Sequence, residues 1–555
     1  MSKSRKAQAP PAKSFGSHLS EWIVYASIVV FTLWQGSYFP LQFMLMLALL
    51  MAAFVLAGRT AIISIEPLLL FAISLLYFLS LGIFSENRYA GLVEAIRTLV
   101  LPLSLITFRN SDSARTEKAI FAALMCVAIL GLLSFASIIY IPGGVIEESN
   151  RLQSVIQYAN TTALLMLVGA LYAAEMFFAR RKIANLVCCA IFLVSLVLTG
   201  SRTTLVVALA ACFLYAFVKT GRRGRIIEAC SLVAAVCAVV CLNALTDIRL
   251  FRISLYEPTL VERWITYGDA AAMMRGKWLT GIGAGNWQEW QFRLQSAPYN
   301  VKYVHNHYIQ LLLDAGALAP LLFFAATVPA ICKGLRSKSL HSIILIAIMA
   351  HAVLDFDLIF GAVAMIAMYS LSQLASGGKT IKIGKIRFAV IAPLLAVVVL
   401  WGSEAFSALG DSALARGRME SAMGEYRASL ALNPLNTGLY YQMAQSTRDI
   451  ELTEEYIRTA IDENPRDSRS ISILALIESR NGNYGAALGL CKQLMENRKF
   501  SEEHQLLYLE IAGQAAALGI IGDREHEEVM EEIAAIRRQA NPLYIQYIEN
   551  EENGK

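Results

Sequence analysis

Long apolar runs alternate with short polar breaks from residue 21 to about residue 402. An apolar run of about 17 to 25 residues can cross a bilayer as a helix. The pattern predicts an all-α fold built on a polytopic transmembrane helical bundle. About thirteen spans are expected, near residues 22–38, 41–57, 67–84, 90–107, 118–139, 159–179, 184–199, 203–219, 226–245, 307–331, 341–354, 357–375 and 387–402.

Beyond residue 402 the apolar runs give way to charged, helix-like sequence with repeated turn signals. One unit ends at Asn433-Pro434 and a second at Asn464-Pro465, about 31 residues later, and another helix opens after Asn481-Gly482. These units resemble tetratricopeptide-type helix pairs, whose period is about 34 residues. We therefore expect a TPR-like helical solenoid over residues 403–545 and a short tail at 546–555. A plain helical bundle is the alternative interpretation.

The distribution of basic residues predicts the orientation in the membrane, because Lys and Arg favour cytoplasmic loops. If the N-terminal tail (1–20) is cytoplasmic, every basic cluster of the membrane domain (21–402) falls in a cytoplasmic connection. A large loop at 246–306 then lies outside, and an odd number of spans places the C-terminal domain outside as well. The predicted location is the cytoplasmic (inner) membrane.

The amino-acid composition limits the partners and cofactors that this protein is expected to bind. Apolar residues make up 56% of the 555 residues and charged residues only 16%, well below the roughly 25% of soluble domains. The net charge of +5 comes from loops beside the membrane, so we expect a lipid bilayer and no nucleic acid as partner. Eight of the nine cysteines lie in or beside apolar runs, and their spacing suggests packing, with no metal site or disulfide framework.

Polar and charged residues, several of them arginines and histidines, lie on the predicted outer face. Charged groups near membrane depth are costly and usually functional. Arginine binds phosphate oxygens bidentately, and histidine can accept a proton near neutral pH. A polyprenyl diphosphate in the outer leaflet would use both properties. The candidate residues are Arg151, Asn160, Arg202, Arg263, His305, Asn306, His307, His351 and Asp355.

Three stretches carry a family resemblance: Leu198-Thr-Gly-Ser-Arg-Thr-Thr204, then Glu262-Arg-Trp264 with Gly281-Ile-Gly-Ala-Gly-Asn286, then His305-Asn-His-Tyr-Ile-Gln-Leu311. Their order and spacing resemble the O-antigen ligase and O-antigen polymerase superfamily, over roughly residues 140–375. The resemblance implies a GT-C-like membrane glycosyltransferase without metal or cofactor. It would move a glycan from an undecaprenyl-diphosphate carrier to an acceptor hydroxyl on the extracytoplasmic face.

The resemblance also implies roles for individual residues. His305 takes the position of the catalytic histidine, Arg202 and Arg263 take diphosphate-binding positions, and Arg151 is a further candidate. Asn160, Asn306, His307, His351 and Asp355 are expected to support the site, with His307 as the alternative base.

Each role has a structural alternative. His305 could cap a helix, Arg202 could anchor at the interface, and Arg263 could pair with Glu262 or Glu257. Arg151 could pair with acidic neighbours. His351 and Asp355 could form a hydrogen-bonded pair with a structural role.

The function stays open at two levels. Within the glycosyltransferase interpretation, the acceptor could be lipid A core, a growing glycan or a protein, and the solenoid could bind a protein partner. Outside it, a transporter or flippase of lipid-linked sugars would need polar residues deep in the spans, for which Glu94 and Arg97 are the candidates. A non-catalytic scaffold would need neither the outer arginines nor His305.

Overall fold

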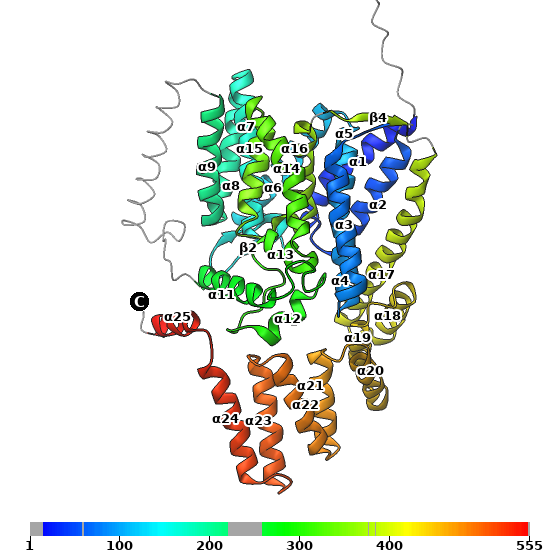
Figure 1. Ribbon diagram of the computed structural model, residues 1–555, viewed down its shortest axis with the longest axis vertical. Helices are drawn as coiled ribbons and strands as arrows, with labels where there is room; N and C mark the ends of the chain where they lie inside the picture. Colours follow the sequence, from blue (N-terminus) through cyan, green and yellow to red (C-terminus); the bar gives the residue numbers. More distant parts are fainter. Residues whose placement is uncertain (1–14, 58–59, 220–257, 376, 383–384, 553–555) are drawn as a thin grey trace, which may run out of the picture.

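The computed structural model describes residues 15–57, 60–219, 258–375, 377–382 and 385–552. Within these ranges the chain is almost entirely helical, as the apolar pattern predicted. A bundle of apolar helices forms one end of the molecule and the C-terminal helices extend from the other (Figure 1). The span predicted at 226–245 and the first part of the large loop lie outside the described residues.

Seven helices of the described ranges are long and apolar enough to cross a membrane. They are α3 (Ile65–Phe84), the joined pair α4 (Arg88–Thr98) and α5 (Val100–Arg109), α6 (Ser113–Phe135), α7 (Ala159–Arg180), α9 (Arg202–Lys219), α14 (Leu318–Arg336) and a segment containing α17 (Ile391–Ala415). Shorter apolar helices are α2 (Pro40–Leu56), α8 (Ile183–Leu198), α15 (Leu340–His351) and α16 (Gly361–Leu374), and α1 covers Phe15–Leu33. The count of about thirteen spans stays a prediction.

The span predicted at 307–331 is in fact two helices. α13 (His307–Ala315) ends at Gly316, whose φ of 77° lies in the left-handed region, and α14 begins at Leu318. A Cβ at Gly316 would lie 2.0 Å from the carbonyl oxygen of Leu279, so only glycine fits this approach. The large loop thus presses against the helix break, and a continuous helix cannot form there.

Two small sheets lie at opposite sides of the bundle. β1 (Thr60–Ile63) pairs antiparallel with β4 (Lys379–Lys382), at the end away from the C-terminal helices (Figure 1). β2 (Val145–Ile146) pairs with β3 (Arg151–Leu152) near the large loop. One of the predicted cytoplasmic connections, at residues 379–387, and the large loop predicted to lie outside are therefore at opposite ends of the bundle. The alternation of spans requires this arrangement.

The described part of the large loop forms a small folded unit on the bundle. It contains α11 (Pro258–Met273) and α12 (Trp287–Leu294). Its core joins Val261, Ile282 and Trp287 to Leu313 of α13. The backbone N–H of Ile282 also donates to the carbonyl of Leu313 at 2.7 Å. The loop is therefore fixed to the first helix that follows it.

α17 connects the bundle to the C-terminal domain without a break, so the predicted boundary at residue 403 falls inside a helix. The helices that follow are α18 (Met419–Leu432), α19 (Leu439–Gln445), α20 (Ile450–Glu463), α21 (Ser468–Arg480), α22 (Tyr484–Asn497), α23 (Glu502–Ala517), α24 (Asp523–Arg538) and α25 (Pro542–Glu552). Up to α24, each packs against the next in sequence. The tetratricopeptide assignment stays a prediction.

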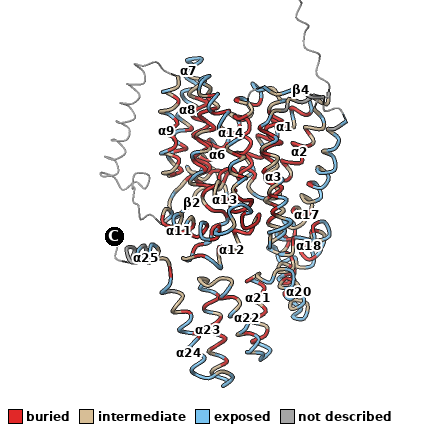
Figure 2. The backbone as a smooth tube through the Cα atoms, in the orientation of Figure 1, coloured by how far each residue is buried: buried red, intermediate tan, exposed pale blue. Residues whose placement is uncertain are grey.

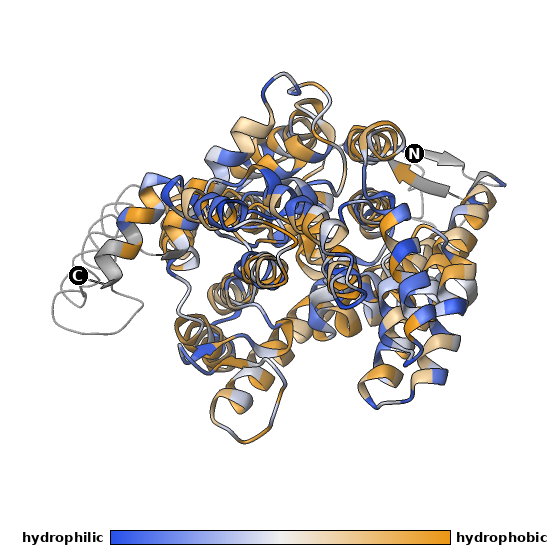
Figure 3. Ribbon diagram, turned by 90° about the horizontal axis from the view of Figure 1, so that it is seen from below, coloured by the Kyte–Doolittle hydropathy of each residue, from blue (hydrophilic) through white to orange (hydrophobic). Residues whose placement is uncertain are grey.

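Burial differs between the two parts. Buried residues fill the centre of the bundle, whereas the C-terminal helices are buried along stripes and exposed elsewhere (Figure 2). Apolar ribbon is prominent in the bundle, and the C-terminal helices carry both hydrophilic and hydrophobic residues (Figure 3). This contrast fits helices that face lipid in the bundle and water beyond it.

Candidate active site

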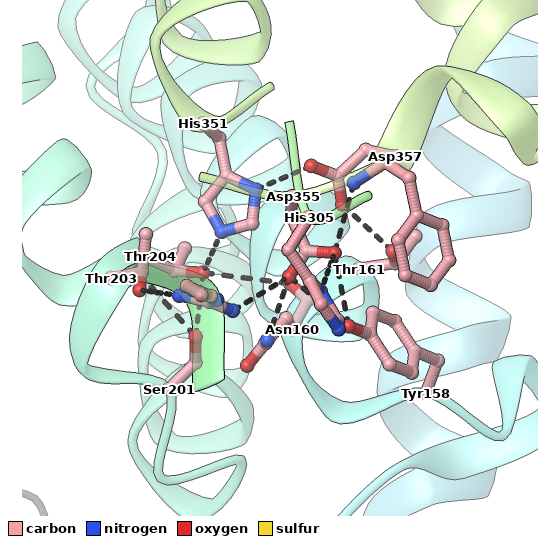
Figure 4. A network of polar contacts seen from close by, with 12 residues as sticks. Tyr158, Asn160, Thr161, Ser201, Thr203, Thr204, His305, His351, Asp355 and Asp357 are labelled. Atoms are coloured by element: carbon pink, nitrogen blue, oxygen red, sulfur yellow. Dashed lines mark hydrogen bonds and ion pairs between the residues drawn. The ribbon is translucent and has the colours of Figure 1, made fainter. Parts of the chain in front are cut away.

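Asp355 is the centre of a polar network at the end of the bundle that carries the large loop. It lies in the turn after α15, and its side chain has no exposed surface. The Tyr158 hydroxyl donates to its Oδ1 at 2.9 Å, and Asn160 Nδ2 donates to its Oδ2 at 2.8 Å. Because a buried carboxylate needs such donors, these bonds fix its position. Figure 4 shows the three side chains converging.

His305 reaches this carboxylate from the end of the large loop. Its Nδ1 lies 3.4 Å from Asp355 Oδ1, and its side chain is 18% exposed. Its ring lies against Phe356, with centroids 5.2 Å apart, and its carbonyl accepts a hydrogen bond from the Tyr267 hydroxyl. If Nδ1 holds the proton toward Asp355, the other ring nitrogen carries the lone pair. The arrangement suits a histidine base oriented by a carboxylate.

Arg263 of α11 contacts the same carboxylate. Its Nη2 lies 3.4 Å from Asp355 Oδ2, and its Nη1 donates to Thr203 Oγ1 at 3.5 Å. Among the described residues Arg263 forms no ion pair with Glu262, and Glu257, the other predicted partner, lies outside them. Asp355 therefore places a histidine and an arginine side by side.

Burial of Asp355 by itself raises the pKa of its carboxyl. The hydrogen bond and charge of His305, with the charges of Arg263 and His351, outweigh burial and hold that pKa well below its ordinary value. Burial and the charge of Asp355 raise the pKa of Tyr158 well above its usual range. Asp355 is therefore an ionised acceptor and Tyr158 a protonated donor across neutral pH.

A second histidine–aspartate pair lies beside the first. His351 Nδ1 contacts Asp357 Oδ2, and neither side chain is exposed. The other nitrogen of His351 lies 2.8 Å from Thr204 Oγ1, and Thr161 donates to Asp357 at 2.7 Å. The predicted pairing of His351 with Asp355 is therefore wrong. His351 closes α15 and the turn reverses the chain, so that Asp357, and not Asp355, returns to it (Figure 4).

Part of the chain that contributes to this network matches a known protein family. Residues 187–324 match the family model described as O-antigen ligase. This segment of the chain is similar to the O-antigen ligase family. The match contains Arg202, Arg263 and His305, whereas Asp355 and His351 lie beyond its end. No curated protein matches the chain.

The match and the apolar helices together indicate a multi-pass inner-membrane protein with a function of O-antigen ligase or polymerase type. Such proteins act on lipid-linked glycans and acceptor molecules in the membrane. Among the described residues, no group of three or more His, Cys, Asp or Glu side chains is arranged to hold a metal ion.

Arg151 and Asn160 connect the matched segment to the preceding part of the bundle. Arg151 donates through Nε to the carbonyl of Thr199 at 2.8 Å and through Nη2 to Asn160 Oδ1 at 3.1 Å. Asn160 therefore links Arg151 to Asp355. Arg202 is the first residue of α9, directly before Thr203 and Thr204, which contact Arg263 and His351. All three predicted arginines thus lie around one network.

Asn306 and His307 have other positions. Asn306, and not His305, caps α13, because its Oδ1 accepts from the backbone N–H groups of Tyr308 and Ile309 at 3.0 and 3.1 Å. His307 is buried against Phe323, and within the described residues neither of its ring nitrogens has a hydrogen-bond partner. Neither side chain belongs to the Asp355 network.

Sequence reasoning missed several members of the network. Four of them lie within two positions of residues that were predicted for the site, namely Asn160, Arg202 and Asp355. These four are Tyr158, Thr203, Thr204 and Asp357. Tyr267 follows Arg263 by four positions on α11, a spacing that places both on one helix face. From this spacing, Tyr267 could have been predicted from the sequence as a neighbour of Arg263.

Proposed function

We propose that this protein is a glycosyltransferase that moves a glycan from an undecaprenyl-diphosphate carrier to an acceptor hydroxyl, with His305 as general base. The observation that carries the proposal is that Asp355 contacts both His305 and Arg263. One carboxylate thus holds the proposed proton acceptor beside the proposed phosphate-binding group, and both residues lie within the segment that is similar to O-antigen ligases.

The reaction can be written from these groups. The acceptor oxygen attacks the anomeric carbon of the lipid-linked sugar, and the bond from that carbon to the diphosphate oxygen breaks. The acceptor proton passes to His305, and Asp355 stabilises the imidazolium that forms. The electron pair of the broken bond leaves with the diphosphate.

Arginines and a helix terminus support the departing diphosphate in this proposal. Arg263 and Arg202 supply fixed positive charge and paired N–H donors. Arg202 is also the first residue of α9, and the N-terminus of a helix attracts anions. Arg151, which is held by hydrogen bonds to Thr199 and Asn160, adds a third positive charge to this group of arginines. The proposed mechanism needs no divalent metal, because these groups can neutralise the diphosphate.

The face on which transfer occurs follows from the arrangement. The large loop and the C-terminal helices lie at the same end of the bundle (Figure 1), and the network joins that loop through His305. With the basic connections in the cytoplasm, that end is extracytoplasmic. The C-terminal domain would then face the same compartment as the acceptor.

The transport alternative has less support. Its candidate residues, Glu94 and Arg97, form an ion pair of 3.2 Å on one helix. Arg97 also donates to the carbonyls of Tyr38 and Ile359 at 2.8 and 3.1 Å. These bonds fix Arg97 within the bundle, where a transport pathway would require a side chain that exchanges partners.

The reaction class can be tested with purified full-length protein in lipid nanodiscs. An undecaprenyl-diphosphate-linked oligosaccharide and a mixture of lipid A core, glycan and peptide acceptors are supplied. We expect glycan-bearing acceptor together with one equivalent of free undecaprenyl diphosphate, and unchanged turnover in excess chelator. Movement of intact donor across proteoliposomes without bond cleavage would contradict the proposal. Loss of turnover in chelator, restored by magnesium, would contradict the metal-independent step.

A further inference from the structure

A polar cavity of about 630 Å³ lies between the large loop and the C-terminal helices. The loop contributes Gln288 and Asn300, and the C-terminal domain contributes Gln442 of α19 and Asn464 after α20. Its volume falls within the range of about 300–1,000 Å³ that is typical of ligand sites.

Contacts on several sides hold the two walls together. Arg466 forms an ion pair with Glu86, which precedes α4. The guanidinium carbon of Arg498 lies 3.8 Å from the ring centroid of Phe292 on α12. The backbone N–H of Asn541 donates to the carbonyl of Ser296 at 2.7 Å. The cavity therefore has two walls in a fixed relation, which a gap between loosely attached domains would lack.

The lining has an unusual chemistry for a protein–protein or lipid surface. Carboxamides are prominent, and a carboxamide both donates and accepts hydrogen bonds, as hydroxyl groups do. Among the described residues, the side chains of Asn300 and Gln442 have no hydrogen-bond partner of their own. The carboxamide residues on the two walls include Gln288, Gln291, Asn300, Asn436, Gln442 and Asn464.

Charged side chains of both signs line the cavity, and some of them are paired. Arg469 pairs with Asp467 at 3.3 Å, and Arg466 pairs with Glu86. The ring of Phe292 on the same wall offers an apolar face. Lys302 and Arg498 also line the cavity, and among the described residues neither forms an ion pair. A lipid tail would need an apolar lining. Carboxamides, a few charged groups and an aromatic ring together suit a hydroxyl-rich chain.

The cavity continues toward the proposed base. A second cavity of about 140 Å³ shares Tyr89, Gln288 and Lys302 with the first and extends to Tyr303. The Tyr303 ring lies 5.4 Å from Phe356, and Phe356 lies 5.2 Å from the His305 ring. A ligand that occupies both cavities would therefore have one end at Tyr303, and the packed rings of Tyr303 and Phe356 would lie between that end and His305.

We propose that this cavity binds the glycan chain of the acceptor and directs its end toward His305. The C-terminal domain then serves as one wall of an acceptor subsite built from carbohydrate-binding groups. The direction of the chain rests on the proposed function, but binding of carbohydrate does not.

The test is binding of oligosaccharides to full-length protein in nanodiscs. The probes are short neutral and acidic bacterial oligosaccharides, with an unstructured peptide of similar mass. Gln442→Trp and Asn300→Trp fill the cavity from opposite walls. Gln445→Trp lies on the same helix as Gln442 but outside the cavity lining and is the matched control. We expect Gln442→Trp and Asn300→Trp each to weaken binding of neutral oligosaccharides by at least about tenfold, and Gln445→Trp by less than about twofold.

Thermal unfolding of each variant, compared with that of Gln445→Trp, separates loss of the site from loss of the fold. Three results would overturn the inference: no oligosaccharide binding by the wild-type protein, binding that both cavity variants leave intact, or peptide binding with the same dependence on Gln442. His305→Ala should bind oligosaccharide as the wild type does. If oligosaccharide binds as expected but no glycan is transferred, the proposed function fails while the binding site stands.

Discussion

The two histidine–aspartate pairs at the turn after α15 consist of the same residue types but differ in what surrounds them. His305 is 18% exposed and shares Asp355 with Arg263, whereas His351 and Asp357 have no exposed side-chain surface. Threonines occupy the remaining polar atoms of the second pair. A general base must reach its substrate, so the first pair suits chemistry and the second suits packing.

The elements that carry the histidines explain the difference. His305 comes from the end of the large loop, directly before α13, and His351 is the last residue of α15 inside the bundle. Through Thr204, His351 ties α15 to the start of α9, where Arg202 and Thr203 lie. The buried pair thus helps to fix the start of α9, whereas His305 of the first pair keeps part of its side chain exposed.

The largest effect is expected from His305→Ala. Removal of a general base typically lowers a rate by about 10²–10⁴-fold. Donor binding should remain near the wild-type level, because the arginines are untouched. The measurement is single-turnover transfer from lipid-linked donor, beside a donor-binding assay. His307→Ala is the matched control and should be far milder. A dead His307→Ala with an active His305→Ala would reverse the assignment.

His351→Ala should act mainly on stability. Removing one partner of a buried ion pair leaves a charge uncompensated and costs about 3–5 kcal/mol. Chemical unfolding in mild detergent should show this loss, with residual activity in the folded fraction. The double variant His351→Gln with Asp357→Asn leaves no unpaired charge and should regain part of the stability. If His351→Ala is fully stable but inactive, the contrast between the pairs fails.

Arg263→Ala should have an intermediate effect. A hydrogen bond to a charged group contributes about 1.5–3 kcal/mol, which corresponds to a roughly 10- to 100-fold slower transfer. Arg263→Lys should restore the charge but not the paired donors, so recovery should be partial. Steady-state transfer at varied donor concentration is the readout. Arg275→Lys, at the exposed end of the same loop segment, should match the wild type.

Asn306→Ala should have the smallest effect, on stability, because its side chain caps α13. Loss of an N-cap typically costs about 1 kcal/mol. Thermal unfolding should show a small decrease, and Asn306→Asp should retain the cap and the stability. A large loss of donor binding in Asn306→Ala would show that the side chain has a role in the site that its contacts do not reveal.

The apolar pattern was sufficient to predict the helical bundle, because spans are set by local sequence. It could not predict the break at Gly316, which depends on the carbonyl of Leu279 in a separate segment. Helix breaks of this kind arise from tertiary contacts.

Several candidate residues were found in sequence, and the structure brings Arg151, Asn160, Arg263, His305 and Asp355 into one network. Their pairing was not predictable. Arg263 and Thr203 are in contact although 60 residues separate them in the sequence. His351 pairs with Asp357 because the short turn after α15 brings that carboxylate back to the histidine. Residue type indicates chemistry, but partners follow from the fold.

The central claim is that His305 and Asp355 act as one unit. The most direct measurement is a double-mutant cycle of single-turnover transfer with wild type, His305→Ala, Asp355→Asn and the double variant, with donor binding measured for each. If Asp355 acts mainly by orienting His305, the loss in the double variant should be far smaller than the product of the two single losses, and any loss beyond that of His305→Ala should reflect the contact of Asp355 with Arg263. If the two losses multiply instead, the residues act independently, and the proposed base and its orienting carboxylate are wrong.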